Sequence, residues 1–253
     1  MYQLLRLKLP FTNKLQDAET GIVFDFMADE NSFEGRVLTG HDNGNITINI
    51  SEADDIEREM ARKRMNEVYR SLLGHFRHEI GHYYFDRLIS NTDHIHQFRH
   101  LFGDERMDYA AALDNYYRQG PATNWSQQFI SAYATSHPWE DWAETWAHYL
   151  HILDTLETAY AFGLRVDPLV AEADDALNAD INYDPYKIKS IESLLKLWLP
   201  LTFALNSLNR SMGLQDTYPF FITDAVRQKM KFIHWVVRNR PEKTTVVPML
   251  MAM

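Results

Sequence analysis

Cysteine is absent from this chain of 253 residues, so neither disulfide bonds nor thiolate metal ligands are available to it. Long apolar runs are also missing: the most apolar stretch, residues 194–205, is short and is interrupted by Lys196 and Pro200. A transmembrane helix needs about 20 apolar residues, so none is expected. The first residues contain Arg6 and Lys8 and are too broken for a signal peptide. We therefore expect a cytoplasmic protein without a membrane partner, in which any metal site uses histidine and carboxylate ligands.

Positive charge is scarce as well. The chain has 25 Lys and Arg against 35 Asp and Glu, a net charge of −10, so on average it repels a phosphate backbone. No nucleic acid is expected as a partner. Hydrophobic residues make up 45% of the chain, as in a folded protein with a substantial core. We expect one domain over residues 1–253, with a small sheet and the metal helix in 1–90 and a helical part in 91–253.

The motif His78-Glu79-Ile80-Gly81-His82 carries the strongest chemical signal. Residues four apart lie on one face of a helix, so His78 and His82 can bind one metal ion while Glu79 leans over the same ion. This is the His-Glu-x-x-His signature of zinc hydrolases, and it predicts Zn²⁺ as the cofactor. The metal-free interpretation is a buried amphipathic helix whose histidines form hydrogen bonds within the core.

The surroundings of the motif predict a helix over about 71–89. Apolar side chains recur every four residues and predict a face that packs on a core: Leu72, Phe76, Ile80, Tyr84 and Leu88. A second stripe would face a cleft: Gly74, His78, His82 and Asp86. Gly81 lowers helix stability by about 1 kcal/mol relative to Ala, and such a glycine usually marks the close approach of another backbone.

Two strands are predicted before this helix. Residues 21–27 are rich in β-branched and aromatic side chains, and residues 45–50 alternate Ile with polar residues. Residues 39–44 between them form a turn signal. The edge of such a sheet could bind a peptide by β-addition, and an ordinary buried sheet is the alternative. A helix over about 51–69 follows, with Ser51 as its cap.

The rest of the chain is predicted to be mostly helical, which makes the fold class α+β, predominantly helical. Further helices are expected at about 103–120, 126–134, 186–211 and 222–239. An acidic connection spans 166–185, and a frayed or partner-docked tail follows Pro241. Residues 91–100 have the composition of a polar loop. Its histidines could bind a second metal ion, but we favour surface histidines: His94, His96 and His100.

A second motif, residues 137–151, predicts a helix with Pro138 at its first position. Glu140, Glu144 and His148 share one face. The opposite face is apolar: Trp142, Trp146, Tyr149 and Leu153. A catalytic zinc typically keeps three protein ligands, so the histidine pair needs one more donor, and a glutamate on this helix supplies it.

Without a metal, Glu140 and Asp141 would merely complement the N-terminus of this helix. That explanation does not cover Glu144, a turn deeper among tryptophans, where an unpaired charge would be costly. The order Glu-x-x-Ala-Glu after His-Glu-x-Gly-His resembles the gluzincin metallopeptidases. The resemblance implies that Glu140 is the third zinc ligand and that Glu144 orients a ligand histidine. No Gly-x-x-His follows His82, which disfavours the metzincins.

Five phrases extend the resemblance over most of the chain: Thr39-Gly40-His41, Glu52-Ala53-Asp54-Asp55, Phe76-Arg77-His78-Glu79-Ile80-Gly81-His82-Tyr83-Tyr84, Phe102-Gly103-Asp104-Glu105-Arg106 and His137-Pro138-Trp139-Glu140-Asp141-Trp142-Ala143-Glu144. Together they resemble a bacterial family of zinc-binding metallopeptidases, from about Tyr2 to Leu164 and beyond. We therefore expect a zincin-like fold, with a small N-terminal sheet packed on the metal-binding helix, and a peptide or protein substrate. Longer family members carry a cysteine-rich N-terminal segment that is missing here, so we expect a shortened chain.

The expected chemistry follows from these residues. Glu79 would take a proton from a zinc-bound water and pass it to the leaving amine. Tyr133 resembles the tyrosine with which some gluzincins stabilise the oxyanion, and a tyrosine that packs in the core is the alternative. Glu144 and Asp86 are candidates to accept the far N–H of a ligand histidine, although Asp86 could instead pair with Arg87.

Three kinds of protein other than a peptidase stay open at this point. A catalytically silent zinc-binding regulatory protein would recognise a partner through the cleft without hydrolysis. A zinc hydrolase of non-peptide amides or esters would have a small closed pocket rather than a groove beside the strand at 45–50. A purely structural helical module would bind no metal. No oligomeric state is predicted.

Overall fold

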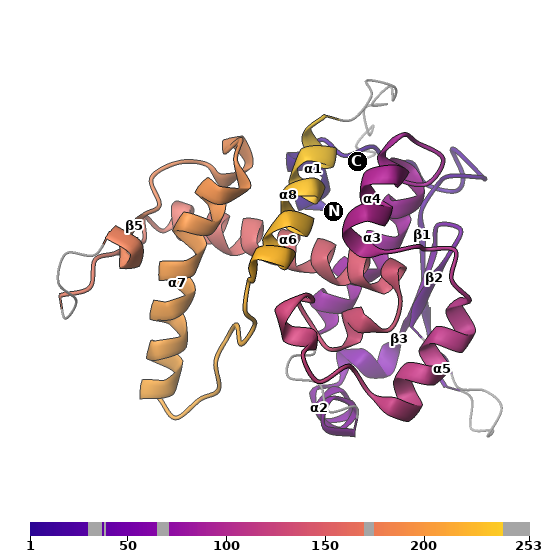
Figure 1. Cartoon of the computed structure of the whole chain (residues 1–253), viewed down its shortest axis with the longest axis horizontal. Helices are drawn as coiled ribbons and strands as arrows, with labels where there is room; N and C mark the ends of the chain where they lie inside the picture. The colour runs from indigo at the N-terminus through magenta and orange to yellow at the C-terminus, as the bar shows by residue number, and fades with distance from the viewer. Residues whose placement is uncertain (30–36, 38, 65–70, 170–174, 240–253) are drawn as a thin grey trace, which may run out of the picture.

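The structure of this chain is a computed structural model that describes residues 1–29, 37, 39–64, 71–169 and 175–239. Within these ranges helices dominate, and a three-stranded sheet lies to one side of them (Figure 1). The predicted α+β, predominantly helical class is confirmed. The elements follow in this order: α1 (Tyr2–Arg6), β1 (Val23–Met27), β2 (Gly40–Asp42), β3 (Asn45–Asn49), η1 (Ile50–Ala53), α2 (Asp55–Arg64), α3 (Leu72–Leu88), α4 (His94–Phe102), α5 (Tyr109–Gln119), η2 (Trp125–Gln127), η3 (Tyr133–Thr135), α6 (Pro138–Ala161), β4 (Arg165–Val166), η4 (Asp175–Leu177), β5 (Ala179–Asp180), η5 (Pro185–Lys187), α7 (Ile191–Ser211) and α8 (Asp224–Arg238).

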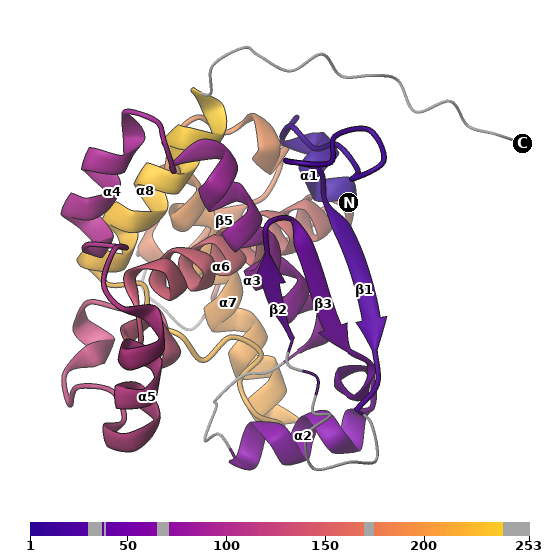
Figure 2. The same ribbon diagram turned by 90° about the vertical axis from the view of Figure 1, so that its right-hand side faces the viewer.

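The larger sheet has the strand order β1-β3-β2, with β3 parallel to β1 and antiparallel to β2 (Figure 2). The strands predicted at 21–27 and 45–50 are confirmed as β1 and β3. Residues 39–44, predicted to be only a turn, also contain β2, because three residues are too few to show a period of two. Since β3 lies in the middle, the edge of the sheet next to α3 is β2 and not the strand at 45–50.

Helix α3 carries the first motif and supports the sheet. Ser71 caps it by accepting a hydrogen bond from Gly74 N at 3.0 Å, at the predicted boundary. The ring of Phe76 lies 5.7 Å from that of Phe24 and 6.2 Å from that of Phe26, both on β1. These contacts hold the sheet on the helix, as predicted. All residues from 77 to 85 are buried, so the second half of α3 lies inside the protein.

Helix α6 passes α3 at very short range. A Cβ on Gly81 would lie 3.0 Å from Ala143 Cα and 3.3 Å from Trp146 Cβ. Trp142 Nε1 donates a hydrogen bond to the Gly81 carbonyl at 2.8 Å. The close approach predicted for Gly81 is therefore confirmed. The predicted apolar stripe of α6 is fully buried: Trp142, Trp146, Tyr149 and Leu153.

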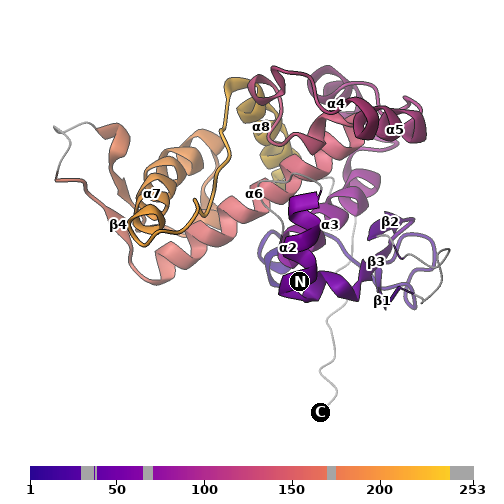
Figure 3. The same ribbon diagram turned by 90° about the horizontal axis from the view of Figure 1, so that it is seen from below.

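The start of α6 is fixed by a cap and by a buried ion pair. The helix begins at Pro138, as predicted, and His137 accepts a hydrogen bond from Trp139 N. Asp141, which is 0% exposed, pairs with Lys229 Nζ of α8 at 2.6 Å. The whole of α6, 24 residues from Pro138 to Ala161, runs toward α7 (Figure 3). The pair therefore holds the first turn of α6 against α8.

Several predicted boundaries between the two motifs are wrong. Residues 91–100 are not a polar loop, because α4 begins at His94. The helix is mostly polar, but Phe98 and Phe102 are buried. The histidines of this helix are surface residues, as favoured: His94 Nδ1 donates to the Leu88 carbonyl, and His96 and His100 are exposed. The helix predicted at 126–134 is absent from this described segment, where only η2 and η3 form. Within this segment Ser131 donates a hydrogen bond to Glu144 of α6 and accepts one from Ala134 N.

The remaining helices form where they are predicted, but α5 begins six residues and α7 five residues later than expected. The segment at 103–120 is helical from 109 to 119 as α5, after an Asp108 cap, and α7 and α8 match the helices expected at 186–211 and 222–239. The predicted helix at 51–69 begins as η1 and α2, and its end after residue 64 lies outside the described residues. The tail after Pro241 and residues 170–174 of the acidic connection also lie outside them. Every described helix is too short or too polar to traverse a bilayer.

Replacing Gly81 with Ala tests the contact between α3 and α6. The extra methyl group should destabilise the packed contact by about 1–3 kcal/mol. Alanine is more favourable in a helix than glycine by about 1 kcal/mol, which offsets part of this. We therefore expect a net loss of about 1 kcal/mol in the free energy of unfolding. Gly40→Ala is the control, because nothing lies within 4 Å of a Cβ at that position. Urea denaturation of both variants checks this. Equal stability of Gly81→Ala and the wild type would contradict the tight packing.

Replacing Lys229 with Met tests the buried ion pair. An uncompensated charge inside a protein costs about 3–5 kcal/mol, and we expect that loss for Lys229→Met near pH 8. Burial already raises the pKa of Asp141 to about 7 against the pull of Lys229, so at pH 5 the variant can protonate the aspartate and should lose less. The double variant Asp141→Leu/Lys229→Met should recover most of the loss. A loss that is the same at pH 5 and pH 8 speaks against a buried charge.

Candidate metal centre

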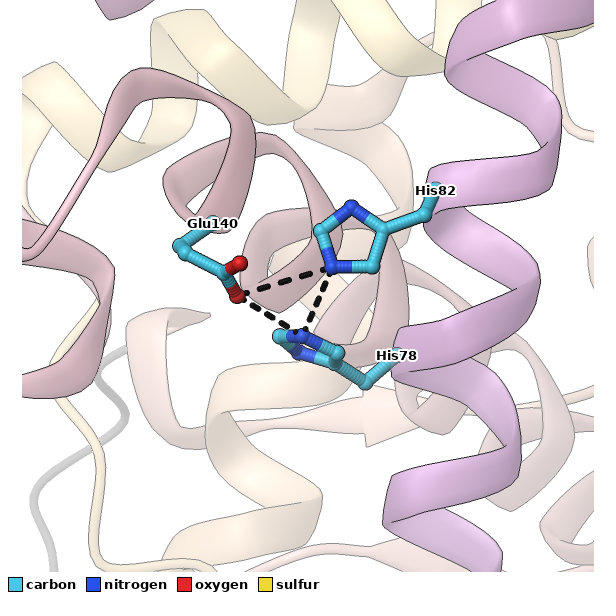
Figure 4. Close-up of side chains that lie close together, drawn as sticks. All are labelled: His78, His82 and Glu140. Atoms are coloured by element: carbon cyan, nitrogen blue, oxygen red, sulfur yellow. Dashed lines mark hydrogen bonds and ion pairs between the residues drawn. The ribbon is translucent and has the colours of Figure 1, made fainter. Parts of the chain in front are cut away.

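Three side chains from two helices converge on one point. His78 and His82 lie one turn apart on α3, and Glu140 lies in the first turn of α6 (Figure 4). The two Nε2 atoms are 3.1 Å apart, and Glu140 Oε2 lies 2.9 Å from His78 Nε2 and 3.5 Å from His82 Nε2. Within the described residues these three form the only group of histidine and carboxylate side chains close enough to share a metal ion.

These spacings fit a small cation. Nitrogen and oxygen donors bind zinc at about 2.0–2.2 Å, and around a tetrahedral ion such donors lie about 3.3–3.6 Å apart. The observed separations of 2.9–3.5 Å are close to that range. Glu140 Oε2 is also buried without accepting a hydrogen bond of normal geometry. Two imidazoles and one carboxylate are a donor set that zinc prefers, so the residues fit this metal.

Glu144 orients the first histidine. Its Oε1 accepts a hydrogen bond from His78 Nδ1 at 2.7 Å, and its Oε2 accepts one from Ser131 Oγ at 2.6 Å. Because Nδ1 holds its proton toward Glu144, Nε2 is the ring nitrogen left to bind a metal. This is the contact that the gluzincin resemblance implies. Ser131 also accepts a hydrogen bond from Ala134 N, which links Glu144 to the turn that carries Tyr133.

The two carboxylates stay ionised despite their burial. Burial raises the pKa of Glu144, but the hydrogen bond and charge of His78, the charge of His148 and the hydrogen bond from Ser131 together outweigh it and lower this pKa to about 2. Burial likewise opposes ionisation of Glu140, and the charge of His82 and the contact with His78 hold its pKa well below the usual value. Two negative side chains beside the imidazoles favour the binding of a cation.

The second histidine is held by aromatic rings. The ring of His82 lies 3.9 Å from that of Trp139 and stacks at 6.3 Å on that of His41 of β2. Its Nδ1 is buried without a hydrogen-bond partner. Burial raises the pKa of Asp86 and the nearby His82 opposes this, so the two side chains are close, but Asp86 forms no hydrogen bond with that nitrogen. Packing rather than a carboxylate therefore orients His82.

Tyr109 is a site residue that sequence reasoning missed. Its hydroxyl donates a hydrogen bond of 2.7 Å to Glu140 Oε1, the carboxylate oxygen that faces away from the histidines. The phenol thereby leaves Oε2 as the oxygen that points to the metal position. No spacing in the sequence predicts this contact, because Tyr109 lies on α5, 31 residues before its partner. His41 stands out in the sequence only through the phrase Thr39-Gly40-His41, which assigns it no role.

Glu79 and Tyr133 line one cavity of about 730 Å³ together with His78. The ring of Tyr133 lies 5.9 Å from that of His78. In the described part of the chain its hydroxyl makes no hydrogen bond, and burial raises its pKa well above the usual value, so the phenol keeps its proton. A carboxylate and a phenol therefore border the same space as the candidate ligand His78.

The comparisons with known proteins agree with this site. Residues 1–236 match the family described as "Putative zinc-binding metallo-peptidase", and the chain belongs to that family. It is 48% identical over 236 residues to proteins of Mycobacterium tuberculosis and Mycobacterium bovis, each described as an uncharacterized protein. The match covers 93% of this chain but only 65% of these relatives. No solved structure shows a significant match.

Zinc affinity of three variants tests the assignment of ligands. Glu140→Ala removes the candidate third ligand and should weaken zinc binding most. Glu144→Ala and Tyr109→Phe remove groups that orient a ligand, and each should weaken binding by about 10–100-fold. Competition with a chelating dye measures the affinities, with Tyr183→Phe, an exposed tyrosine, as the control. A larger loss for Glu144→Ala than for Glu140→Ala would reverse the assignment of the third ligand.

Proposed function

We propose that this protein is a zinc-dependent metallopeptidase that hydrolyses peptide bonds with Glu79 as the general base. The observation that carries the proposal is the convergence of His78, His82 and Glu140 beside a cavity that Glu79 also borders. The proposal includes a zincin-like arrangement in which residues 1–253 act as one unit: the part at 1–90 supplies the histidines and the part at 91–253 supplies the third ligand.

The protein's own side chains divide the chemistry among them. Zinc, when bound, lowers the pKa of water to about 7 and polarises a carbonyl group. Glu79 takes the proton of the attacking water and delivers it to the leaving nitrogen, so the amine departs neutral. Tyr133, with its proton retained, donates to the oxygen that becomes negative as the carbonyl turns tetrahedral. Glu144 and Tyr109 keep the ligands His78 and Glu140 in position.

The form of the cavity favours a peptide over a small amide or ester. A hydrolase of such small molecules would have a small closed pocket, whereas this cavity is about 730 Å³ and is bordered from several sides of the fold. Thr39 and Asn49 contribute from the sheet region, Tyr116 from α5 and Phe220 from the segment before α8. A volume of about 730 Å³ also lies in the range of small-molecule sites, so it is the spread of the lining over several elements that favours a chain with more than one side chain.

A structural module and a silent zinc-binding protein both explain less of the site. A structural module would not need His78, His82 and Glu140 to converge on one point with Glu140 Oε2 buried and without a hydrogen bond of normal geometry. A silent zinc-binding protein would need the metal ligands alone, but here Glu79 also follows His78 and borders the cavity. The overall charge of −10 speaks against a nucleic acid as partner. We therefore propose a peptide or protein as the substrate.

The variant Glu79→Gln tests the mechanism. Glutamine keeps the size of the side chain but cannot take a proton, so we expect kcat/KM on a mixed peptide library to fall by about 10²–10⁴-fold. Zinc content should stay at the wild-type level, because Glu79 is not among the ligands. Mass spectrometry of the cleaved library measures the rate. Equal cleavage by the wild type and the variant would rule out Glu79 as the base.

A further inference from the structure

Helix α5 differs from the other long helices because none of its residues is buried. Tyr109 and Tyr117 are 39% and 59% exposed, and no described element packs along the helix over any length. Figure 2 shows α5 set apart from the sheet at one side of the molecule. Its sequence is nonetheless amphipathic. An apolar face that does not pack on a core requires another explanation.

That face borders the cavity of the metal centre. Four residues of α5 line the cavity, and their spacing places them on one side of the helix: Tyr109, Leu113, Tyr116 and Tyr117. The wall continues through the next segment with Trp125 and Phe129. No residue that lines the cavity from the segment 109–129 is charged, whereas η1 and α2 contribute Glu52, Glu57 and Arg58 to the lining. One wall is therefore aromatic and uncharged.

The aromatic wall is connected to the reacting centre by two contacts. Tyr109, at the start of α5, donates its hydrogen bond to the ligand Glu140. About two helical turns further on, the ring of Tyr116 meets that of Tyr133 at 5.8 Å in an edge-to-face arrangement. A group bound against Tyr116 and Tyr117 would thus lie next to the phenol assigned to the oxyanion, within the same cavity.

We propose that Tyr116, Tyr117 and Trp125 form a subsite for a large apolar or aromatic side chain of the peptide, next to the bond that is cleaved. The subsite rests on the proposed peptidase function and adds a preference to it. Tyrosine and tryptophan rings bind apolar side chains by releasing water and by edge-to-face contacts, and they lose little conformational freedom on binding. A lysine or glutamate side chain would leave its charge without a partner on this wall.

The test uses zinc-loaded protein and a series of blocked nonapeptides that differ only in a central Phe, Leu, Ala, Lys or Glu. We expect kcat/KM for the Phe peptide to exceed that for the Lys and Glu peptides by about tenfold or more, mainly through KM. The double variant Tyr116→Ala/Tyr117→Ala should reduce the ratio of Phe to Ala peptide to within about threefold of unity. Tyr116→Phe/Tyr117→Phe keeps the rings and should retain the ratio. Tyr160→Ala, at an exposed tyrosine near the far end of α6, is the control.

The outcomes separate the subsite from the function. Cleavage of all peptides without preference for Phe or Leu, or a preference that survives in the double alanine variant, overturns the subsite and leaves the peptidase intact. If no peptide is cleaved, the peptidase proposal fails, and binding of the same peptides to the zinc-loaded protein decides the subsite. Binding that prefers Phe over Lys and loses this preference in the double variant supports it. Equal binding of the Phe and Lys peptides, or no binding of either, overturns the proposed subsite.

Discussion

The site depends on how closely α3 and α6 approach each other at Gly81 and Ala143. A side chain at residue 81 would collide with the backbone of α6, and Trp142 uses the space to donate its hydrogen bond to the Gly81 carbonyl. At this distance the side chain of Glu140 on α6 reaches the imidazoles of His78 and His82 on α3 directly. The candidate metal ligands thus lie on two helices whose separation is set by core packing, which suits a site that must hold its geometry.

Burial of charge explains the surroundings of this contact. An ionised carboxylate inside a protein needs partners, and each buried acid at the start of α6 has them: Glu140 has Tyr109 and the histidines, Asp141 has Lys229, and Glu144 has His78 and Ser131. Three acids within five residues are therefore held by α3, α5, α8 and the turn at η3. The same contacts that satisfy the charges fix the direction of each side chain.

The sequence predicts those parts of the fold and site that follow from local periodicity and from short-range chemistry. The spacing of His78 and His82, Pro138 at the start of α6 and the glycine at 81 all follow from rules that act within a few residues. Tyr109, Ser131, His41 and Lys229 could not be predicted, because each meets its partner only after distant segments fold together.

Two elements of the fold also could not be predicted. The strand β2 is too short to show an alternating pattern, and the helix α4 is too polar to show a clear helical period of apolar residues. The expected contact between Asp86 and His82 fails for a related reason: helical spacing places the two residues near each other but does not direct the carboxylate toward the ring.

The family relationship, the convergent ligands and the cavity support one account, in which two imidazoles and one carboxylate share a zinc ion at the border of a peptide-binding space. Its most direct test is anomalous X-ray scattering at the zinc edge from crystals of the zinc-loaded protein. The account predicts one strong peak at about 2.0–2.2 Å from His78 Nε2, His82 Nε2 and Glu140 Oε2. A peak bound to other side chains, or a Glu140 that turns away from an occupied histidine pair, would contradict it.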